Sequence, residues 1–156
     1  EMSVLASYRR LSSKPGGRWL FSKLVCLKAP YFASIAPRIE VLEPGRGVAT
    51  IAHRRRVTNH IGTVHAIALC NLAEFVGGLT CDVSTPASMR WIPKGMTVAY
   101  LKKAVGTMRA TATPAFPPRE ANEGYELPFE VVVENPQGEA VFRATIAMWV
   151  SPKATR

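Results

Sequence analysis

Two groups of residues near the middle of the chain could act together on a carbonyl compound. The first is the run Asn59-His60-Ile61-Gly62-Thr63-Val64-His65-Ala66, which leads directly into an apolar segment, and the second is Glu74, nine residues after His65. A carboxylate can serve as a general base or as a nucleophile. If a helix begins at Ala66, its free N–H groups and the positive end of its dipole would polarise a carbonyl oxygen. Together, a carboxylate and a polarising helix N-terminus are suited to nucleophilic attack on a carbonyl carbon. They could lie close together if a partner subunit contributes one of the two groups.

Glu74 lies in a segment whose other residues predict a buried helix. The segment Ala66–Gly78 is apolar almost throughout, and at helical spacing Ile67, Asn71, Glu74 and Gly78 share one face. Burying a carboxylate is costly unless it is paired, hydrogen-bonded or protonated. Glu74 is therefore either a functional carboxylate or one that pairs with an arginine or faces a wet crevice for reasons of packing.

The polar residues that precede this helix also have structural interpretations when each is taken alone. His65 could be a helix-start histidine, Asn59 a turn or capping residue, and Gly62 a position that needs backbone freedom. Their convergence on one helix N-terminus favours a functional site.

Periodicity and breaker residues predict an α+β domain built on one sheet. Apolar spacing predicts helices over 3–12 and 18–27, and a core helix over 66–78 that ends at Gly77-Gly78. The predicted strands cover 38–42, 48–57, 96–105, 108–113, 126–134 and 140–150, and Pro93 falls in an irregular stretch before the third of them. Short turns between consecutive strands predict antiparallel pairing.

One sheet of five or six strands wrapped around the apolar helix would enclose it. We therefore predict an N-terminal helical extension over 1–35 and a main domain over 36–151. The open edge strand of such a sheet would be paired by a second copy of the chain, giving a homodimer or a tetramer.

The spacing Asn-x-x-Gly-x-x-His, with a carboxylate nine residues after the His, resembles the signature of hotdog-fold acyl-CoA thioesterases of the phenylacetate-pathway and 4-hydroxybenzoyl-CoA kind. The similarity extends to the strand order over roughly residues 36–150. The helix start His-Ala-x-Ala-Leu is most similar to bacterial hotdog proteins of unassigned function. The resemblance implies a hotdog fold and hydrolysis of an acyl-CoA thioester, without a metal or redox cofactor.

The resemblance also implies a role for each matching residue. Glu74 would act as general base on water or as nucleophile, and Asn59 would help to hold the water or the thioester. His65 would support the site, and the backbone N–H of Ala66 would polarise the thioester oxygen, next to the loop at Gly62.

Two departures from the family pattern bear on these roles. The family often has Gly-Gly after the His, where this chain has Ala66-Ile67, and Ile67 would narrow the acyl pocket. Many members carry Thr or Ser within a turn after the carboxylate, whereas Phe75–Gly78 has no hydroxyl. The second departure leaves a non-catalytic acyl-CoA-binding protein as an alternative. A hotdog dehydratase or hydratase is a weaker one, because no His-Phe-Pro-Gly type segment is present.

The basic charge of the chain is concentrated near its start. Residues 1–38 carry seven basic groups against one acidic group, and the whole chain carries 20 against 11. Such a surface attracts anions. Coenzyme A phosphates are the anions that the resemblance favours, with Arg54, Arg56, Lys94 and Arg109 as the candidate contacts. Arg54-Arg55-Arg56 falls on the predicted strand 48–57, where alternate side chains would face opposite sides.

Other partners and compartments are less favoured by the sequence. Basic residues interleaved with aromatics, typical of single-stranded nucleic-acid binding, occur only at Arg18-Trp19. Contact of residues 1–28 with a membrane surface is a weaker alternative. The three cysteines lack CxxC or Cys/His ligand spacing, which argues against a disulfide framework and a zinc site. Because this cysteine pattern suits a reducing compartment, we predict a cytoplasmic protein, and no signal peptide is visible.

Overall fold

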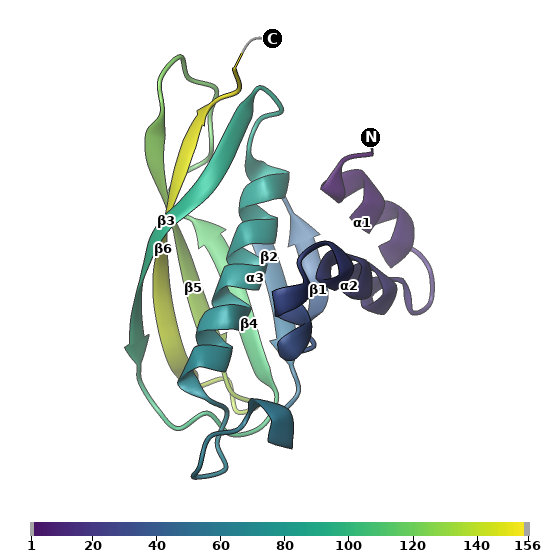
Figure 1. Cartoon of the computed structure of the whole chain (residues 1–156), viewed down its shortest axis with the longest axis vertical. Helices are drawn as coiled ribbons and strands as arrows, with labels where there is room; N and C mark the ends of the chain where they lie inside the picture. The colour runs from purple at the N-terminus through teal and green to yellow at the C-terminus, as the bar shows by residue number, and fades with distance from the viewer. Residues whose placement is uncertain (1, 155–156) are drawn as a thin grey trace.

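The computed structural model describes residues 2–154, in which six strands form one antiparallel sheet in the order β1-β2-β4-β5-β6-β3. The strands are β1 (Arg38–Glu43), β2 (Arg46–Ile51), β3 (Met89–Tyr100), β4 (Met108–Pro114), β5 (Tyr125–Glu134) and β6 (Ala140–Pro152). The sheet curves around one long central helix, α3 (Ala66–Ser84), as Figure 1 shows. The predicted antiparallel sheet around a single core helix is confirmed, with six strands.

Alternation along the strands builds the core between the sheet and α3. In β4, Met108, Ala110 and Ala112 are fully buried, while Arg109 between them is exposed. This period of two places one set of side chains against α3 and the other on the outer face of the sheet. From the helix, the side chains of Leu72, Phe75 and Val76 are buried, and they fill the concave side of the sheet.

The predicted end of the core helix at Gly77-Gly78 is wrong, because α3 continues to Ser84. A Cβ atom at Gly77 would lie 2.7 Å from Cδ1 of Ile146, so this glycine allows α3 to approach β6 closely. The helix ends where Thr85 takes an extended conformation, directly before Pro86. The residue before a proline is biased away from helical geometry, which explains this boundary.

The predicted strand 48–57 is also wrong in its second half. Strand β2 ends at Ile51, and the chain then forms a short 3₁₀ turn, η2 (Arg55–Val57). His53 fixes this segment: its Nδ1 accepts a hydrogen bond from Gly106 N–H at 2.8 Å, and its Nε2 lies 2.9 Å from the carbonyl oxygen of Gly62. The three consecutive arginines therefore do not alternate across a sheet.

Strand β3 begins at Met89 rather than near residue 96, and it includes Pro93. Proline cannot donate a hydrogen bond to a neighbouring strand and is tolerated at sheet edges and bulges. Both conditions hold, because β3 is the last strand of the sheet and its register with β6 shifts between Pro93 and Gly95.

The N-terminal segment forms α1 (Val4–Ser12), α2 (Gly17–Lys28) and a 3₁₀ turn, η1 (Pro30–Ser34), which confirms the two predicted helices. Tyr8 and Phe21 pack edge to face, with ring centroids 5.2 Å apart, and both belong to the core. Ser22 Oγ accepts a hydrogen bond from Ile39 N–H at 2.9 Å, so α2 covers the β1 edge of the sheet.

The described residues include one helix that is long and apolar enough to cross a membrane, and it is α3. Its apolar side chains are instead those that fill the core of the sheet.

Candidate active site

The loop before α3 is held together by the side chain of Asn59. Its Oδ1 accepts hydrogen bonds from the N–H groups of Ile61 (3.2 Å) and Thr63 (3.1 Å), and its Nδ2 donates to Thr63 Oγ1 at 2.8 Å. Gly62 takes a positive φ of 78°, a conformation that favours glycine. The polar atoms of Asn59 thus serve the loop itself, and together with Gly62 they fix the path by which the chain enters the helix.

His65 is the N-cap of α3. Its backbone N–H donates to the carbonyl oxygen of Val57 at 2.8 Å, and its Nδ1 accepts from Ile67 N–H at 3.0 Å. A neutral His65 that accepts at Nδ1 carries its proton on Nε2. The N–H of Ala66 belongs to the first turn, whose donors have no intrahelical acceptor. This arrangement is consistent with the predicted carbonyl-polarising N–H.

Glu74 lies in the middle of α3 and is half-buried. Among residues 2–154, no side chain forms an ion pair or a hydrogen bond with its carboxylate, although basic residues are plentiful. Burial raises the pKa of Glu74 above its ordinary value, because desolvation penalises the charged form. The alternative in which Glu74 is neutralised by an arginine therefore finds no partner in the described chain.

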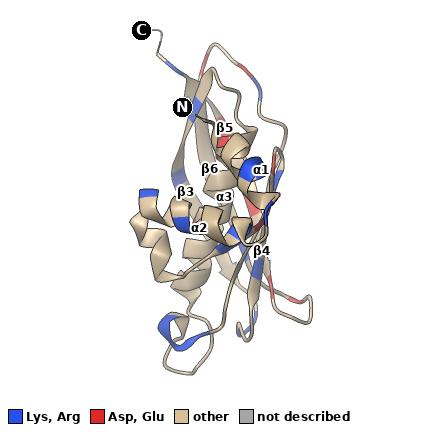
Figure 2. Ribbon diagram, turned by 90° about the vertical axis from the view of Figure 1, so that its right-hand side faces the viewer, with Lys and Arg blue, Asp and Glu red and all other residues tan. Residues whose placement is uncertain are grey.

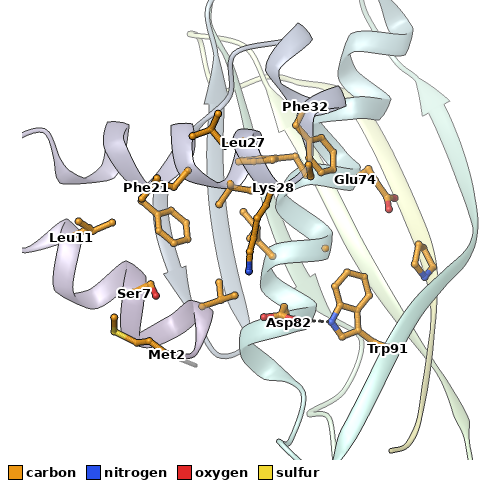
Figure 3. Close-up of a pocket in the computed structure, with 18 residues that line it drawn as sticks. Met2, Ser7, Leu11, Phe21, Leu27, Lys28, Phe32, Glu74, Asp82 and Trp91 are labelled. Atoms are coloured by element: carbon orange, nitrogen blue, oxygen red, sulfur yellow. Dashed lines mark hydrogen bonds between the residues drawn. The ribbon is translucent and has the colours of Figure 1, made fainter.

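Glu74 lines a cavity of about 730 Å³ that opens between the N-terminal helices and the face of α3 (Figure 3). Phe75, Gly78, Leu79, Asp82, Trp91 and Pro93 complete the wall on the side of the core domain. The side chain of Asp82 already has a partner, because Trp91 Nε1 donates to its Oδ1 at 3.1 Å. Glu74 is therefore the carboxylate of this cavity that has no partner among the described residues.

The helix N-terminus and Glu74 do not meet within one chain. Eight residues separate Ala66 from Glu74, which is about 12 Å along a helix axis. No single thioester carbonyl can touch both at once. The two predicted parts of the site are each present, but one copy of the chain does not bring them together.

A second, smaller cavity of about 200 Å³ lies at the N-terminal end of the same helix face, where His65, Ile67 and Asn71 line it. Arg56 and Ser34 stand across from them, and Asn71 Nδ2 donates to Ser34 Oγ at 3.2 Å. The predicted face of Ile67, Asn71, Glu74 and Gly78 thus lines both cavities.

The four basic candidates divide into two groups. Arg54 and Arg56 lie in the segment that leads to the loop, and Nη2 of Arg54 is buried without a hydrogen-bond partner among the described residues. Lys94 and Arg109 lie on the outer face of the sheet, where Lys94 Nζ is 4.0 Å from the centre of the Trp149 ring. Of the four, Arg56 lines the smaller cavity together with His65 and Ile67 of the helix start. Other Lys and Arg residues are spread over several helices and strands (Figure 2).

Sequence reasoning missed two features of this region. His53 holds the carbonyl of Gly62 and gave no signal, because its role depends on a fold contact with Gly106. The N-terminal helices form a wall of the larger cavity, and the apolar stripe of the segment 18–27 was the available signal. Within residues 2–154, no group of three or more His, Cys, Asp or Glu side chains is placed to hold a metal ion.

The sequence matches one family model, described as a domain of unknown function (DUF4442), over residues 17–150. The structure is similar to the crystal structure of the structural-genomics protein APC5556, at 44% identity and a TM-score of 0.82. The match covers 96% of this chain and 98% of that one. No curated protein matches the sequence.

Other similar structures are hotdog-fold proteins described as a thioesterase or a probable thioesterase. A protein of unknown function from Pseudomonas aeruginosa, described as a probable thioesterase, is 26% identical with a TM-score of 0.73, over 83% of this chain and 92% of that one. A thioesterase from Haemophilus influenzae shares the fold at 15% identity and a TM-score of 0.67, over 78% and 82% of the two chains. The predicted hotdog fold, and the resemblance to thioesterases of this fold and to hotdog proteins of unassigned function, are confirmed.

Proposed function

Because the chain belongs to the DUF4442 family and has the hotdog fold of the thioesterases, we propose that it hydrolyses an acyl-CoA thioester. The observation that carries this proposal is Glu74, a half-buried carboxylate that has no partner among the described residues and lines an apolar cavity. A half-buried carboxylate without a partner lowers the free energy of unfolding, which favours a functional reason for its presence. A raised pKa also makes it a better general base than an exposed glutamate.

In the proposed reaction, Glu74 removes a proton from water while the water oxygen attacks the thioester carbon. The negative charge that develops on the carbonyl oxygen is stabilised by the N–H of Ala66 at a helix N-terminus. The C–S bond of the tetrahedral intermediate then breaks, the coenzyme A thiolate takes up the proton that Glu74 removed from water, and the acyl group leaves as a carboxylic acid. Direct attack by the Glu74 carboxylate, followed by hydrolysis of the anhydride, is the alternative route.

The separation of about 12 Å between Ala66 and Glu74 requires two copies for this mechanism. We propose that the loop and helix start of one subunit face Glu74 of the other. His65 and Asn59 then act as positioning residues, since their side chains hold the helix start and the loop that leads to it.

The β3 edge of the sheet is where we place the second copy. β3 is an outer strand, whereas the opposite edge, β1, is bonded to α2. On the α3 side of β3, Met96 and Tyr100 are exposed, and Ile67 is exposed on the neighbouring helix. Open strand edges beside exposed apolar side chains are suited to pairing with another chain. A homodimer, or a tetramer built from it, is the proposed assembly.

For the coenzyme A phosphates, we propose Arg54 and Arg56 as the main contacts because they lie next to the helix start. Lys94 and Arg109 remain predictions, since a partner chain would be needed to bring them to the same substrate. No metal or redox cofactor takes part in the proposed reaction.

The experiment that tests the function is a screen of acyl-CoA esters that differ in chain length and aromaticity, with release of free thiol as the signal. Cleavage by the natural chain and its loss in Glu74→Gln would support the proposal. Retained turnover in Glu74→Gln would overturn the assigned mechanism.

A non-catalytic acyl-CoA-binding protein is the second candidate function. It is favoured by the helix segment that follows the carboxylate: Phe75–Gly78 has no hydroxyl, and Thr80 Oγ1 donates to the carbonyl oxygen of Val76 at 2.6 Å. Binding of acyl-CoA without thiol release in the same screen would establish this alternative.

A further inference from the structure

The larger cavity is formed mainly by the N-terminal extension. Of its 18 lining residues, 11 precede residue 36, and they come from α1, α2, η1 and the residues that flank these elements. In Figure 3 the side chains of Leu11 and Phe21 close one side, and Glu74 and Trp91 lie on the opposite side. The cavity therefore exists only because the two N-terminal helices stand over the face of α3.

The lining of this cavity is apolar. Ser7, Lys28, Glu74 and Asp82 are the only polar residues among those that line it, and Asp82 is bonded to Trp91. Cavities of roughly 300–1,000 Å³ with such walls are the usual sites for small apolar ligands. At about 730 Å³, this one has room for a sizeable hydrophobic group and offers few hydrogen bonds to a polar one.

The cavity extends along α3 from Glu74 toward the C-terminal end of the helix. Glu74, Gly78 and Asp82 all line it, and these residues span about 12 Å of helix axis. The Trp91 ring packs over Gly78, where a Cβ atom would lie only 3.3 Å from Cη2 of Trp91, so glycine at this position lets the indole complete the apolar wall. An elongated apolar group can lie along this wall with its head at Glu74.

We infer that the cavity holds the acyl group of the substrate, and that this group is a medium or long hydrocarbon chain rather than a short or polar one. The inference rests on the proposed function, because it places the thioester carbon at Glu74 and the chain toward Gly78. The N-terminal extension then determines acyl-chain selectivity, and Leu24 of α2 is a selectivity residue at the cavity wall.

Leu24 and Leu20 provide a matched pair of test positions. Both are leucines of α2, one helical turn apart, with side chains of similar exposure (46% and 42%), but only Leu24 lines the cavity. Leu24→Trp should fill part of the cavity from a position near the surface, at little cost in stability. Leu20→Trp adds the same bulk outside it.

The experiment measures kcat/KM for acyl-CoA esters from four to sixteen carbons, and the affinity of the corresponding S-alkyl-CoA thioethers by titration calorimetry. In the natural chain, affinity should rise by about fourfold for each added methylene until the cavity is full. In Leu24→Trp, the loss for a twelve-carbon chain should exceed the loss for a four-carbon chain by at least about tenfold, the effect of roughly two methylenes. Leu20→Trp should leave the chain-length profile as it is.

The outcomes separate this inference from the proposed function. If thioethers bind with the expected profile but no ester is cleaved, the acyl cavity stands and the thioesterase reaction fails. If esters are cleaved without dependence on chain length, or if both tryptophan variants have the same profile, the cavity inference is wrong and the reaction stands. Should Leu24→Trp not fold by circular dichroism, Ser7→Leu, at a half-buried position on the α1 wall, repeats the test.

Discussion

The two ends of the open face of α3 differ in how their polar groups are satisfied. At the N-terminal end, Asn59 and His65 have partners within the same loop and helix start. Eight residues beyond Ala66, Glu74 has none among the described residues and faces an apolar cavity. Polar groups that are shielded from water are normally paired, so a half-buried carboxylate without a partner calls for an explanation, as does the buried Nη2 of Arg54 before the loop. The comparison favours a structural role for Asn59 and His65, and it agrees with the chemical role that we propose for Glu74.

The largest expected effect on activity comes from replacing Glu74, the carboxylate without a partner among the described residues. Glu74→Gln keeps the size of the side chain but removes its basicity and nucleophilicity, so we expect kcat to fall at least about a hundredfold, within the usual range for loss of a general base. Binding of S-alkyl-CoA thioethers should change little. Thiol release and calorimetry on the same samples measure both, and near-full turnover in Glu74→Gln would remove the proposed distinction between the two ends.

The next effect tests whether the two ends meet across subunits. Met96→Lys places a charge on the α3 side of the open β3 edge, and we expect it to yield monomers that have lost most of their activity. Ile92→Lys is the matched control, because Ile92 is an exposed apolar residue of the same strand whose side chain lies on the outer face. Sedimentation velocity gives the oligomeric state of both variants, and turnover of an acyl-CoA ester gives their activity. A fully active monomer of Met96→Lys would show that one chain is sufficient for catalysis.

A smaller effect on activity is expected in the loop before α3, where Asn59 is hydrogen-bonded. Asn59→Ala removes three hydrogen bonds of the loop, so we expect activity to fall by roughly tenfold through mispositioning and stability to fall by about 1–3 kcal/mol. Asn59→Asp retains an oxygen that accepts from Ile61 and Thr63, and it should recover much of both. Denaturant unfolding with parallel kinetics tests this. If the activity of Asn59→Ala falls as far as that of Glu74→Gln while its stability is unchanged, Asn59 takes part directly in catalysis.

His65→Ala should lower activity by roughly tenfold, because His65 also positions the helix start rather than reacting.

The fold could be predicted from the sequence to a large extent because its main signals are local. An apolar segment that needs enclosure, and strands separated by short turns, specify a sheet around one helix. The errors arose where a tertiary contact overrides a local signal. Gly77 reads as a helix stop, but it serves close approach to Ile146, and Pro93 reads as a break, but it lies on an edge strand where its missing N–H costs little.

Candidate residues for the site can be chosen from the sequence, but the shape of the site cannot. The spacing from Asn59 to Glu74 identifies the polar groups, and the face shared by Glu74 and Gly78 does line the cavity. The cavity itself depends on how α1 and α2 lie over that face. No periodicity within the segments 3–12 or 18–27 gives their position relative to α3, because that position is set by contacts such as Tyr8 with Phe21.

Removing single ionic contacts with coenzyme A should have a modest effect on its affinity. This effect also distinguishes the helix start from the outer face of the sheet. Arg56→Ala, beside the helix start, should weaken coenzyme A binding by about fivefold and make it less sensitive to salt. Arg109→Ala, on the outer face of the sheet, should do so only if a partner chain brings that face to the substrate. Titrations at low and high ionic strength compare the two variants. Affinity that does not fall with salt in the natural chain would exclude ion pairing as a major contribution.

The smallest effect concerns stability and follows from the raised pKa of Glu74. Because burial raises the folded-state pKa above the unfolded value of about 4.3, the folded chain binds this proton more tightly. The contribution of Glu74 to stability is therefore fully present below that value and is lost as pH rises through the folded-state pKa. The side chain introduced in Glu74→Gln is neutral at every pH, so the stability of this variant relative to the natural chain should rise as pH passes from the unfolded-state pKa to the folded-state pKa of Glu74 and then level off.

Urea unfolding of both proteins at several pH values measures this difference. Glu123→Gln, at an exposed position outside the cavity, is the control for removing one carboxylate charge from the surface. A stability difference for Glu74→Gln that stays constant, or that moves in favour of the natural chain as pH rises, would mean that the Glu74 carboxylate is well solvated or paired in solution. The contrast between the two ends of α3 would then lose its physical basis, because both ends would hold satisfied polar groups.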